Sequence, residues 1–163
     1  MSYFSRFPLV NHDNNLQVNL TRRVAIDERY KDDASVFFVY NVQDGDTPEN
    51  IADRFYDDVS YCWIVLQFND IVNVFEEWPR SQQELDDYIS DKYDNPYAIH
   101  HYVSISTNEI VSPELHPSYD RLPVTNYEYE VDLNDAKREI RLVLPELANE
   151  VVLAHREQVE RGL

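Results

Sequence analysis

Residues 40–55 read YNVQDGDTPENIADRF, and this stretch indicates a strand, a tight turn and a helix in close succession. The strand is the β-rich run VFFVYNV at residues 36–42, which is followed by the turn-forming sequence Asp-Gly-Asp. Thr47 is a good N-cap, and Pro48 suits the first position of a helix. The helix then places one apolar stripe toward a core, formed by Ile51, Ala52, Phe55 and Tyr56.

Two more helices are predicted directly downstream of this unit. Ser60 can cap a helix that runs to Phe68 and is too apolar to face solvent. Ser81 and Glu84 have the spacing of a capping box, which predicts a third helix. That helix would carry Leu85, Tyr88 and Ile89 on one side.

The C-terminal half combines strand and helix patterns. Alternation over residues 97–105 predicts a half-buried strand, and the three prolines of residues 106–125 predict a loop. Apolar and charged residues alternate on both sides of a turn at Asn134-Asp135, which predicts a β-hairpin over residues 127–144. Pro145 then begins an amphipathic terminal helix.

These elements predict an α+β protein with three segments. Residues 1–35 alternate only weakly and are expected to form an extended N-terminal arm. Residues 36–92 hold the strand and the three helices of a compact module. Residues 93–163 carry the strand, the proline-rich loop, the hairpin and the terminal helix, which we expect to contact partners, since an amphipathic helix needs a surface to pack on.

The charge balance excludes several classes of partner. The chain has 31 acidic and 14 basic residues, a formal net charge of −17, which repels nucleic acid and anionic membrane surfaces. A merely soluble acidic surface and a specific basic partner both remain possible. No stretch approaches the ~20 apolar residues of a membrane span. Arg6 and Pro8 interrupt the apolar N-terminus, so no signal peptide is predicted and synthesis in the cytoplasm is expected.

The sequence offers no pattern for catalysis, a cofactor or a metal site. The single cysteine, Cys62, lies in an apolar run and is expected to be a buried small hydrophobe. His100 and His101 are neighbours on a predicted strand, so their side chains should point to opposite faces and could not share a metal ion. Carboxylates are too abundant to mark an acid–base pair, and no nucleophile or phosphate-loop motif is present. We therefore predict a protein that is not an enzyme.

The stretch from Tyr40 to Phe55 resembles the opening of a LysM module, whose pattern is Y-x-V-x-x-G-D-T followed by a helix that contains Ile-Ala. The sequence Leu-Gln-Phe-Asn at residues 66–69 is similar to the closing helix of that module and its asparagine. LysM modules bind N-acetylglucosamine polymers and continue from this asparagine through a turn into a second strand. Residues 70–80 depart from that pattern, which puts the glycan groove in doubt.

This departure instead resembles the baseplate wedge protein 53 family of contractile-tailed phages. The resemblance rests on Trp63, on Trp78-Pro79, on YDNPY at residues 93–97 with the following HHY, and on YEYE at residues 127–130 with the later KREIR. It covers roughly residues 36–160. It implies a LysM-like module reused for protein contact, in a structural protein of the virion that clamps neighbouring wedges together and toward the hub of the tail baseplate.

The resemblance also implies partners and contact residues. The partners would be other wedge proteins and possibly the hub, with several copies, six being expected, in each baseplate. Aromatic residues dominate the energy of many interfaces, and the terminal helix is predicted to dock. The candidate contact residues are Trp63, Phe68, Phe75, Trp78, Tyr97, Tyr102, Val151 and His155. Ordinary core packing remains an alternative for Trp63 and Phe68.

Two other functions remain open on the sequence. A peptidoglycan-binding LysM module would need affinity for murein or chitin oligomers in residues 36–80. A tail-associated hydrolase would need a catalytic carboxylate, and no constellation of residues for one is present. The sequence therefore favours the structural protein.

Overall fold

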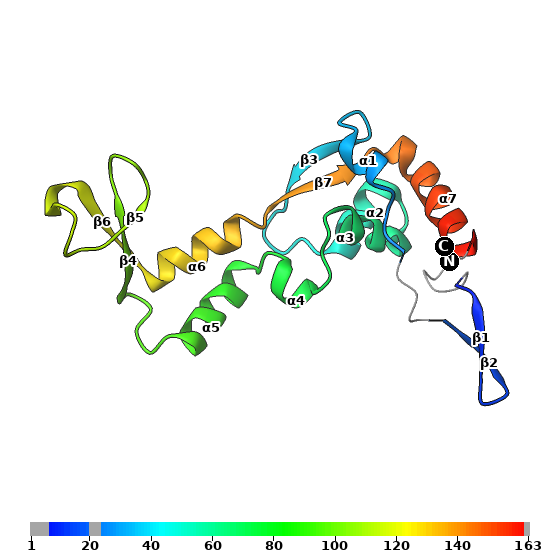
Figure 1. Ribbon diagram of the computed structural model, residues 1–163, viewed down its shortest axis with the longest axis horizontal. Helices are drawn as coiled ribbons and strands as arrows, with labels where there is room; N and C mark the ends of the chain where they lie inside the picture. Colours follow the sequence, from blue (N-terminus) through cyan, green and yellow to red (C-terminus); the bar gives the residue numbers. More distant parts are fainter. Residues whose placement is uncertain (1–6, 20–23, 162–163) are drawn as a thin grey trace. The chain divides into compact units, whose positions relative to one another are not determined.

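The computed structural model describes residues 7–19 and 24–161, and it contains two compact units (Figure 1). Unit 1 combines Met1–Trp78 with Glu139–Leu163, and unit 2 is Pro79–Arg138. The predicted mixed α+β class is confirmed. Unit 2 is thus an insertion within unit 1. The three segments expected from the sequence were defined by their roles rather than by contacts, and that division stays a prediction.

Unit 1 is built on a two-stranded antiparallel sheet. Strand β3, Phe37–Asn41, pairs with β7, Glu139–Val143, which follows the insertion in the sequence (Figure 1). The register places Phe37 opposite Val143 and Asn41 opposite Glu139. The strand predicted at residues 36–42 is therefore confirmed, and its partner is a segment about 100 residues away.

The helices of unit 1 begin where local capping signals place them. Helix α2, Pro48–Tyr56, starts at Thr47, whose side chain accepts a hydrogen bond from Asn50 N at 3.2 Å, as predicted. The predicted cap of the next helix is wrong. The N-cap is Asp58 rather than Ser60, and its side chain accepts a hydrogen bond from Ser60 N. Asp58 begins the short 3₁₀ helix Val59–Tyr61, which leads into α3, Cys62–Phe68. The reason is that Asp58 stands two residues before the amide that needs an acceptor.

The core of unit 1 lies between these helices, the sheet and the terminal helix α7, Pro145–Arg161. One cluster joins α3 to α7, and its fully buried members include Ile64, Phe68, Val143 and Val151. A second joins α2 and α3 to the sheet, with Ile51, Val65 and Leu142 at its centre. The predicted terminal helix is confirmed, and its apolar face packs inside unit 1.

The N-terminal segment is more structured than the extended arm expected from the sequence. Residues 1–6 and 20–23 lie outside the described residues. Strands β1, Leu9–His12, and β2, Asn15–Val18, form a hairpin around Asp13 and Asn14, which both have positive φ. Such a pair of left-handed residues is typical of a two-residue hairpin turn. A short helix, α1, Glu28–Asp32, then packs Tyr30 against the core.

The predicted β-hairpin over residues 127–144 is wrong in its first half. Residues Asn126–Asp135 form helix α6, and only the second half becomes a strand, β7. Thr125 and Glu128 form a capping box, in which Thr125 Oγ1 accepts from Glu128 N at 3.2 Å and Glu128 accepts from Thr125 N at 2.8 Å. This reciprocal cap fixes a helix start that outweighs the strand-like alternation of the tyrosines.

Unit 2 combines two helices with a three-stranded sheet. Helix α5, Gln82–Lys92, begins at the predicted capping box of Ser81 and Glu84. The sheet has the order β5–β4–β6, with β4 at Ile99–Ser104, β5 at Ile110–Val111 and β6 at Arg121–Thr125. The strand predicted at residues 97–105 is confirmed.

The loop predicted over residues 106–125 is only partly correct. This segment supplies β5, the short 3₁₀ helix Ser118–Asp120 and β6. Pro123 sits within β6, which is an edge strand and can therefore tolerate a residue without an N–H group. The prolines do not prevent pairing here because β6 pairs with β4 alone.

Candidate partner-contact surfaces

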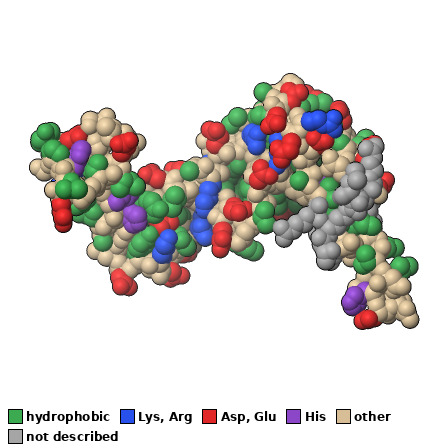
Figure 2. Space-filling view, viewed as in Figure 1, with side chains coloured by type: hydrophobic (Ala, Val, Ile, Leu, Met, Phe, Trp, Pro, Cys, Tyr) green, Lys and Arg blue, Asp and Glu red, His purple; other side chains and the backbone are tan. Residues whose placement is uncertain are grey.

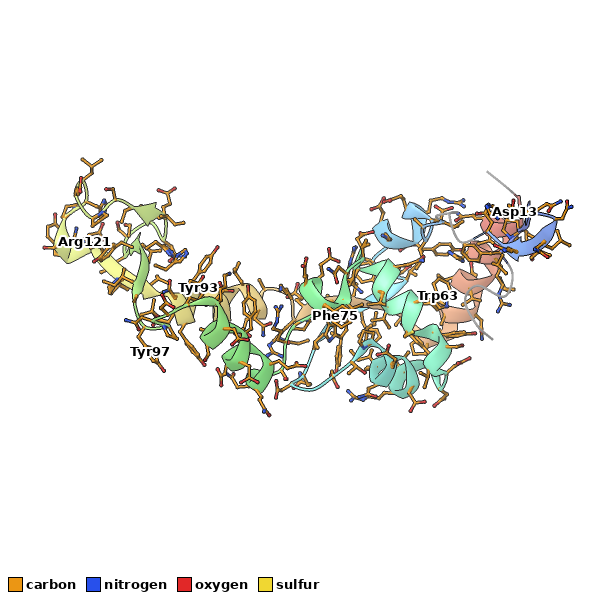
Figure 3. All side chains as sticks on the ribbon, turned by 90° about the horizontal axis from the view of Figure 1, so that it is seen from below. Asp13, Trp63, Phe75, Tyr93, Tyr97 and Arg121 are labelled. Carbon is orange, nitrogen blue, oxygen red and sulfur yellow. The ribbon has the colours of Figure 1, made fainter. Side chains whose placement is uncertain are left out.

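The segment that departs from the LysM pattern forms a hydrogen-bonded turn with two exposed apolar side chains. Val72 is 86% exposed, and Phe75, on the short helix α4, Val74–Glu77, is 88% exposed (Figure 3). Glu77 accepts hydrogen bonds from the N–H groups of Val72 and Asn73, at 2.6 and 2.9 Å. Asn73 in turn caps α4 by accepting from Phe75 N at 3.2 Å. We call this segment, residues 71–77, the apolar turn.

The apolar turn is followed by a buried tryptophan. Trp78 is 7% exposed, and its Nε1 donates to the carbonyl of Asp46 at 2.9 Å. The Asp46 side chain accepts from Tyr40 Oη at 2.6 Å and from Gln43 N at 3.0 Å, and it pairs with Arg54 at 2.8 Å. Burial raises the pKa of the Asp46 carboxyl, but these donors outweigh it and hold the pKa below its ordinary value.

Four candidate contact residues lie inside unit 1 rather than at its surface. Phe68, Trp78, Val151 and His155 are all buried. His155 Nε2 lies 3.3 Å from the carbonyl of Val24, and its ring is 4.6 Å from the half-buried ring of Trp63. Burial lowers the pKa of His155 although the contact with Val24 opposes that shift. Phe68, Val151 and His155 lie where α3 packs against α7, whereas Trp78 belongs to the cluster of α2, α3 and the sheet.

The remaining candidates belong to unit 2. Tyr97 is 75% exposed, and its ring stacks on Tyr127 at a centroid distance of 6.1 Å (Figure 3). Tyr102 is half-buried on β4, with the Arg121 guanidinium 5.1 Å from its ring centroid. Of the candidate residues, Phe75 and Tyr97 are therefore the ones that offer large exposed rings.

The three-stranded sheet of unit 2 has one face that carries a row of apolar residues. Val103 on β4 is directly opposite Ile110 on β5 and Leu122 on β6, so the three side chains share this face. Ile110 is 74% exposed and Leu122 is 52% exposed. We call these three residues the apolar row. Figure 2 shows apolar side chains, in green, at the surface of this part of the chain.

The opposite face of the sheet is covered by its own loop. Arg121 donates to the carbonyl of Pro113 and lies over Tyr102. Asp120 accepts from Ser106 Oγ at 2.9 Å and lies 2.7 Å from His116 Nε2. The hydrogen bond with His116 is the largest of the contacts that hold the pKa of Asp120 below its ordinary value. The loop thus closes one face and leaves the apolar row open.

A buried charge fixes the two helices of unit 2 to each other. Glu130 on α6 is 4% exposed and accepts from Lys92 Nζ and from Tyr93 Oη, each at 2.7 Å. Burial raises its pKa, yet these two donors together bring the pKa below its ordinary value. The same hydrogen bond raises the pKa of Lys92. The pair is structural, since its donors satisfy the carboxylate.

His100 and His101 do not point to opposite faces of the sheet, and the prediction that they do is wrong. Ile99 pairs with Thr125 and His101 pairs with Val124, so an irregularity in the register falls at His100. A bulge of this kind inserts one residue that has no partner across the ladder and reorients its side chain. The two Nδ1 atoms consequently lie 2.9 Å apart.

Sequence reasoning missed Val72 and the apolar row. Val72 could have been found, because it stands three residues before Phe75 in the segment that departs from the LysM pattern. Ile110 and Leu122 lie in what was predicted to be a loop, so only the strand pairing brings them together.

Neither a metal cluster nor a membrane span is evident in residues 7–19 and 24–161. Within these ranges, no three or more His, Cys, Asp or Glu side chains are grouped so that they could hold a metal ion. The helices there are also too short or too polar to cross a membrane. Cys62 is half-buried, and burial raises the pKa of its thiol, which disfavours the reactive thiolate.

Comparison with known families decides the affiliation of the chain. The family model described as base plate wedge protein 53 matches residues 25–111, which is more than half of the 163 residues. The chain belongs to this family. The match runs from the segment before α1 to the end of β5, so it includes the apolar turn and Tyr97. A search of curated proteins found no match.

Membership in the base plate wedge protein 53 family establishes the general role. The chain is a structural protein of the phage tail baseplate and associates with other baseplate proteins. The family resemblance drawn from the sequence is confirmed, whereas the LysM-like detail is compatible with the fold without being established by the match.

Proposed function

We propose that this wedge protein is a clamp of a contractile-tail baseplate, which joins neighbouring wedge subunits and holds them toward the central hub. The observation that carries the proposal is that each compact unit has its own exposed apolar surface. Unit 1 carries the apolar turn, and unit 2 carries the apolar row. Two binding surfaces on one chain allow it to contact two neighbours at once, which strengthens an assembly without one large interface.

The build of the apolar turn supports a role in binding. Valine and phenylalanine side chains this exposed gain free energy when a partner covers them, at roughly 25 cal/mol per Å² of apolar area. The hydrogen bonds that the side chains of Glu77 and Asn73 accept from backbone N–H groups hold the turn before a partner arrives. Less conformational entropy is therefore lost on binding. Such a preformed anchor is typical of residues that dominate interface energy.

The N-terminal hairpin is a third candidate surface. All eight residues of β1 and β2 are exposed, and Leu9, Leu16 and Val18 share one face of the hairpin. A two-stranded hairpin alone is marginally stable in water. We therefore expect it to be ordered by a neighbour in the baseplate.

The decisive experiment separates the two surfaces with paired substitutions. The turn variant carries Val72→Ser and Phe75→Ser, and the row variant carries Ile110→Ser and Leu122→Ser. Each is co-expressed with the other wedge proteins of the same baseplate and analysed by size-exclusion chromatography with light scattering. A clamp requires that each variant loses a different neighbour while its circular dichroism spectrum stays that of the wild type. Val59→Ser, at an exposed valine outside both surfaces, serves as the control.

Point substitutions are preferable to truncation of the terminal helix. The apolar face of α7 packs against α3 in the core, so removing residues 145–163 would unfold unit 1 and abolish every contact indirectly. If neither paired variant loses a neighbour, the clamp is wrong. If only one does, the chain is a peripheral subunit with a single attachment.

The alternative of a peptidoglycan-binding LysM module rests on one feature of the fold. The order β3–α2–α3–β7 places two helices between two paired strands, with unit 2 inserted before the second strand. We propose that a LysM-like module was extended in this way. Retention of the full chain on insoluble murein, with no complex formed with wedge proteins, would favour glycan binding over the clamp.

A further inference from the structure

The bulge at His100 creates an arrangement that regular strand alternation forbids. The rings of His100 and His101 meet edge to face, with centroids 5.1 Å apart and planes at 85°. One Nδ1 must carry a proton for the 2.9 Å contact between these atoms to be a hydrogen bond, while the other offers its lone pair. When that proton moves to Nε2 of the same ring, both Nδ1 atoms can offer lone pairs to one ion near the start of β4.

A tyrosine on the neighbouring helix holds both rings in place. Tyr129 stacks on His100 with a centroid distance of 4.0 Å and an interplanar angle of 11°. The same ring lies 5.8 Å from His101, at 85°. Tyr129 belongs to α6, whose first turn is fixed by the capping box of Thr125 and Glu128. The donors are therefore oriented before any ligand binds, which reduces the cost of binding.

We propose that His100 and His101 form a bidentate chelating site for a late first-row divalent transition metal, with Cu²⁺ preferred. With metal–nitrogen bonds of about 2.0–2.1 Å, two nitrogens 2.9 Å apart subtend about 90° at the metal. That angle suits adjacent positions of a tetragonal site, the geometry of Cu²⁺ and Ni²⁺ with nitrogen and oxygen ligands. A tetrahedral Zn²⁺ would need the nitrogens to move apart.

The remaining coordination positions of the proposed metal ion are accessible to other ligands. His100 is exposed and His101 is half-buried, so water can reach the metal. Figure 2 shows histidine side chains, in purple, at the surface of this part of the chain. The described residues bring no third His, Cys, Asp or Glu side chain to this pair. Water, or a side chain of a neighbouring protein, completes the coordination. Hard cations such as Mg²⁺ and Ca²⁺ are excluded because they prefer oxygen ligands.

The test titrates the metal alone into the purified full chain. Cu²⁺ is added in a non-coordinating buffer at neutral pH, with binding followed by calorimetry and by electron paramagnetic resonance. The expected result is one Cu²⁺ per chain with two nitrogen ligands, weaker binding of Ni²⁺, and Zn²⁺ weaker than Cu²⁺. His100→Asn and His101→Asn should each weaken Cu²⁺ binding roughly 100-fold, because even outer-shell changes cost 10–100-fold.

Matched variants separate this site from adsorption to the acidic surface. His12→Asn removes another exposed histidine beside an aspartate and should leave the affinity and the two-nitrogen signal unchanged. Tyr129→Phe keeps the stacked ring and should bind as the wild type does. Tyr129→Leu should weaken binding although α6 stays helical by circular dichroism. The proposal is overturned if His100→Asn or His101→Asn binds Cu²⁺ like the wild type, or if the resonance shows fewer than two nitrogens.

Discussion

Asn69 forms hydrogen bonds with both backbone polar groups of Arg141, 72 residues further along the chain. Its Nδ2 donates to the Arg141 carbonyl at 2.8 Å, and its Oδ1 accepts from the Arg141 N–H at 2.8 Å. The same Nδ2 also donates to Val65 O at 2.8 Å. The Asn69 side chain therefore pairs with the backbone of β7 through two hydrogen bonds, as a neighbouring strand would, and it links β7 to the end of α3.

Loss of this side chain should destabilise unit 1. Asn69→Ala leaves the polar groups of Arg141 without their partner in a half-buried position, so we expect a loss of about 3 kcal/mol in the free energy of unfolding. Urea unfolding followed by tryptophan fluorescence measures the change. Asn50→Ala, at an exposed asparagine of α2, should cost less than about 0.5 kcal/mol. Equal losses in the two variants would contradict the role of Asn69.

Removal of the insertion should leave unit 1 folded. The side chain of Asn134 forms two hydrogen bonds with the backbone of Arg80. Its Oδ1 accepts from the Arg80 N–H at 2.7 Å, and its Nδ2 donates to the Arg80 carbonyl at 3.1 Å. This contact brings the two ends of unit 2 close together. A chain with residues 80–137 replaced by a short Gly-Ser linker should therefore keep β3 paired with β7.

Amide hydrogen exchange provides the measurement. Protection of the β3 amides in the shortened chain should match that in the full chain. Asn134→Ala in the full chain serves as a companion variant and should lower protection in α5 and α6 alone. Loss of protection in β3 on removal of the insertion would mean that unit 1 cannot fold without unit 2.

The Asp46 carboxylate should contribute stability that depends on pH. Its pKa in the folded chain lies below the ordinary 3.8, so its contribution is present above pH 3.8 and is lost as the pH falls through the lowered value. Asp46→Asn should reduce stability by about 2 kcal/mol at neutral pH, because Tyr40, Gln43 and Arg54 lose a charged acceptor.

Thermal unfolding at pH 7 and at pH 3 checks this expectation. The difference between wild type and Asp46→Asn should shrink at the lower pH. Asp53→Asn, an exposed aspartate of α2, is the matched control and should change little at either pH. A difference that stays constant between pH 7 and pH 3 would show that the charge of Asp46 does not matter.

His155 should make unit 1 less stable in mild acid. Burial lowers its folded pKa below the ordinary 6.5, so the unfolded chain takes up a proton that the folded chain resists as the pH falls through 6.5. Stability should therefore decrease between pH 7 and pH 5. His155→Gln removes the titration, and its stability should vary less over this range.

The comparison of slopes isolates this one histidine. The other four histidines and all carboxylates are common to both proteins, so the difference between the two pH profiles reports His155 alone. Chemical unfolding at four pH values between 5 and 7 is sufficient. Parallel profiles would mean that His155 titrates as it does in the unfolded chain.

Local signals in the sequence predicted most of the helices. They failed where the structure of a segment depends on residues far away in the sequence. The caps at Thr47 and Ser81 were read correctly because a cap involves residues three positions apart. The same signature at Thr125 and Glu128 was overlooked in favour of alternating tyrosines, and this gave a false hairpin. The pairing of β3 with β7 has no local signal, since it joins segments about 100 residues apart.

The candidate contact residues show the same limit. Composition identifies large apolar side chains, but only tertiary packing decides whether each is inside or outside. Trp78 and Phe75 are three residues apart, yet one donates to Asp46 within the core and the other is exposed. The bulge at His100 is also invisible to a rule of strict alternation, because one inserted residue reverses the faces that follow.

The interrupted build of unit 1 sets an order of events during synthesis on the ribosome. Strand β3 emerges early, but its partner β7 is translated only after the whole of unit 2 has appeared. Unit 2 can fold as it emerges, whereas the sheet of unit 1 has to wait. A chain that stops short of β7 consequently lacks the surface on which Asn69 and the helix α3 are fixed. Completion of unit 1 therefore depends on the last part of the chain to be synthesised, whereas unit 2 is complete before β7 is translated.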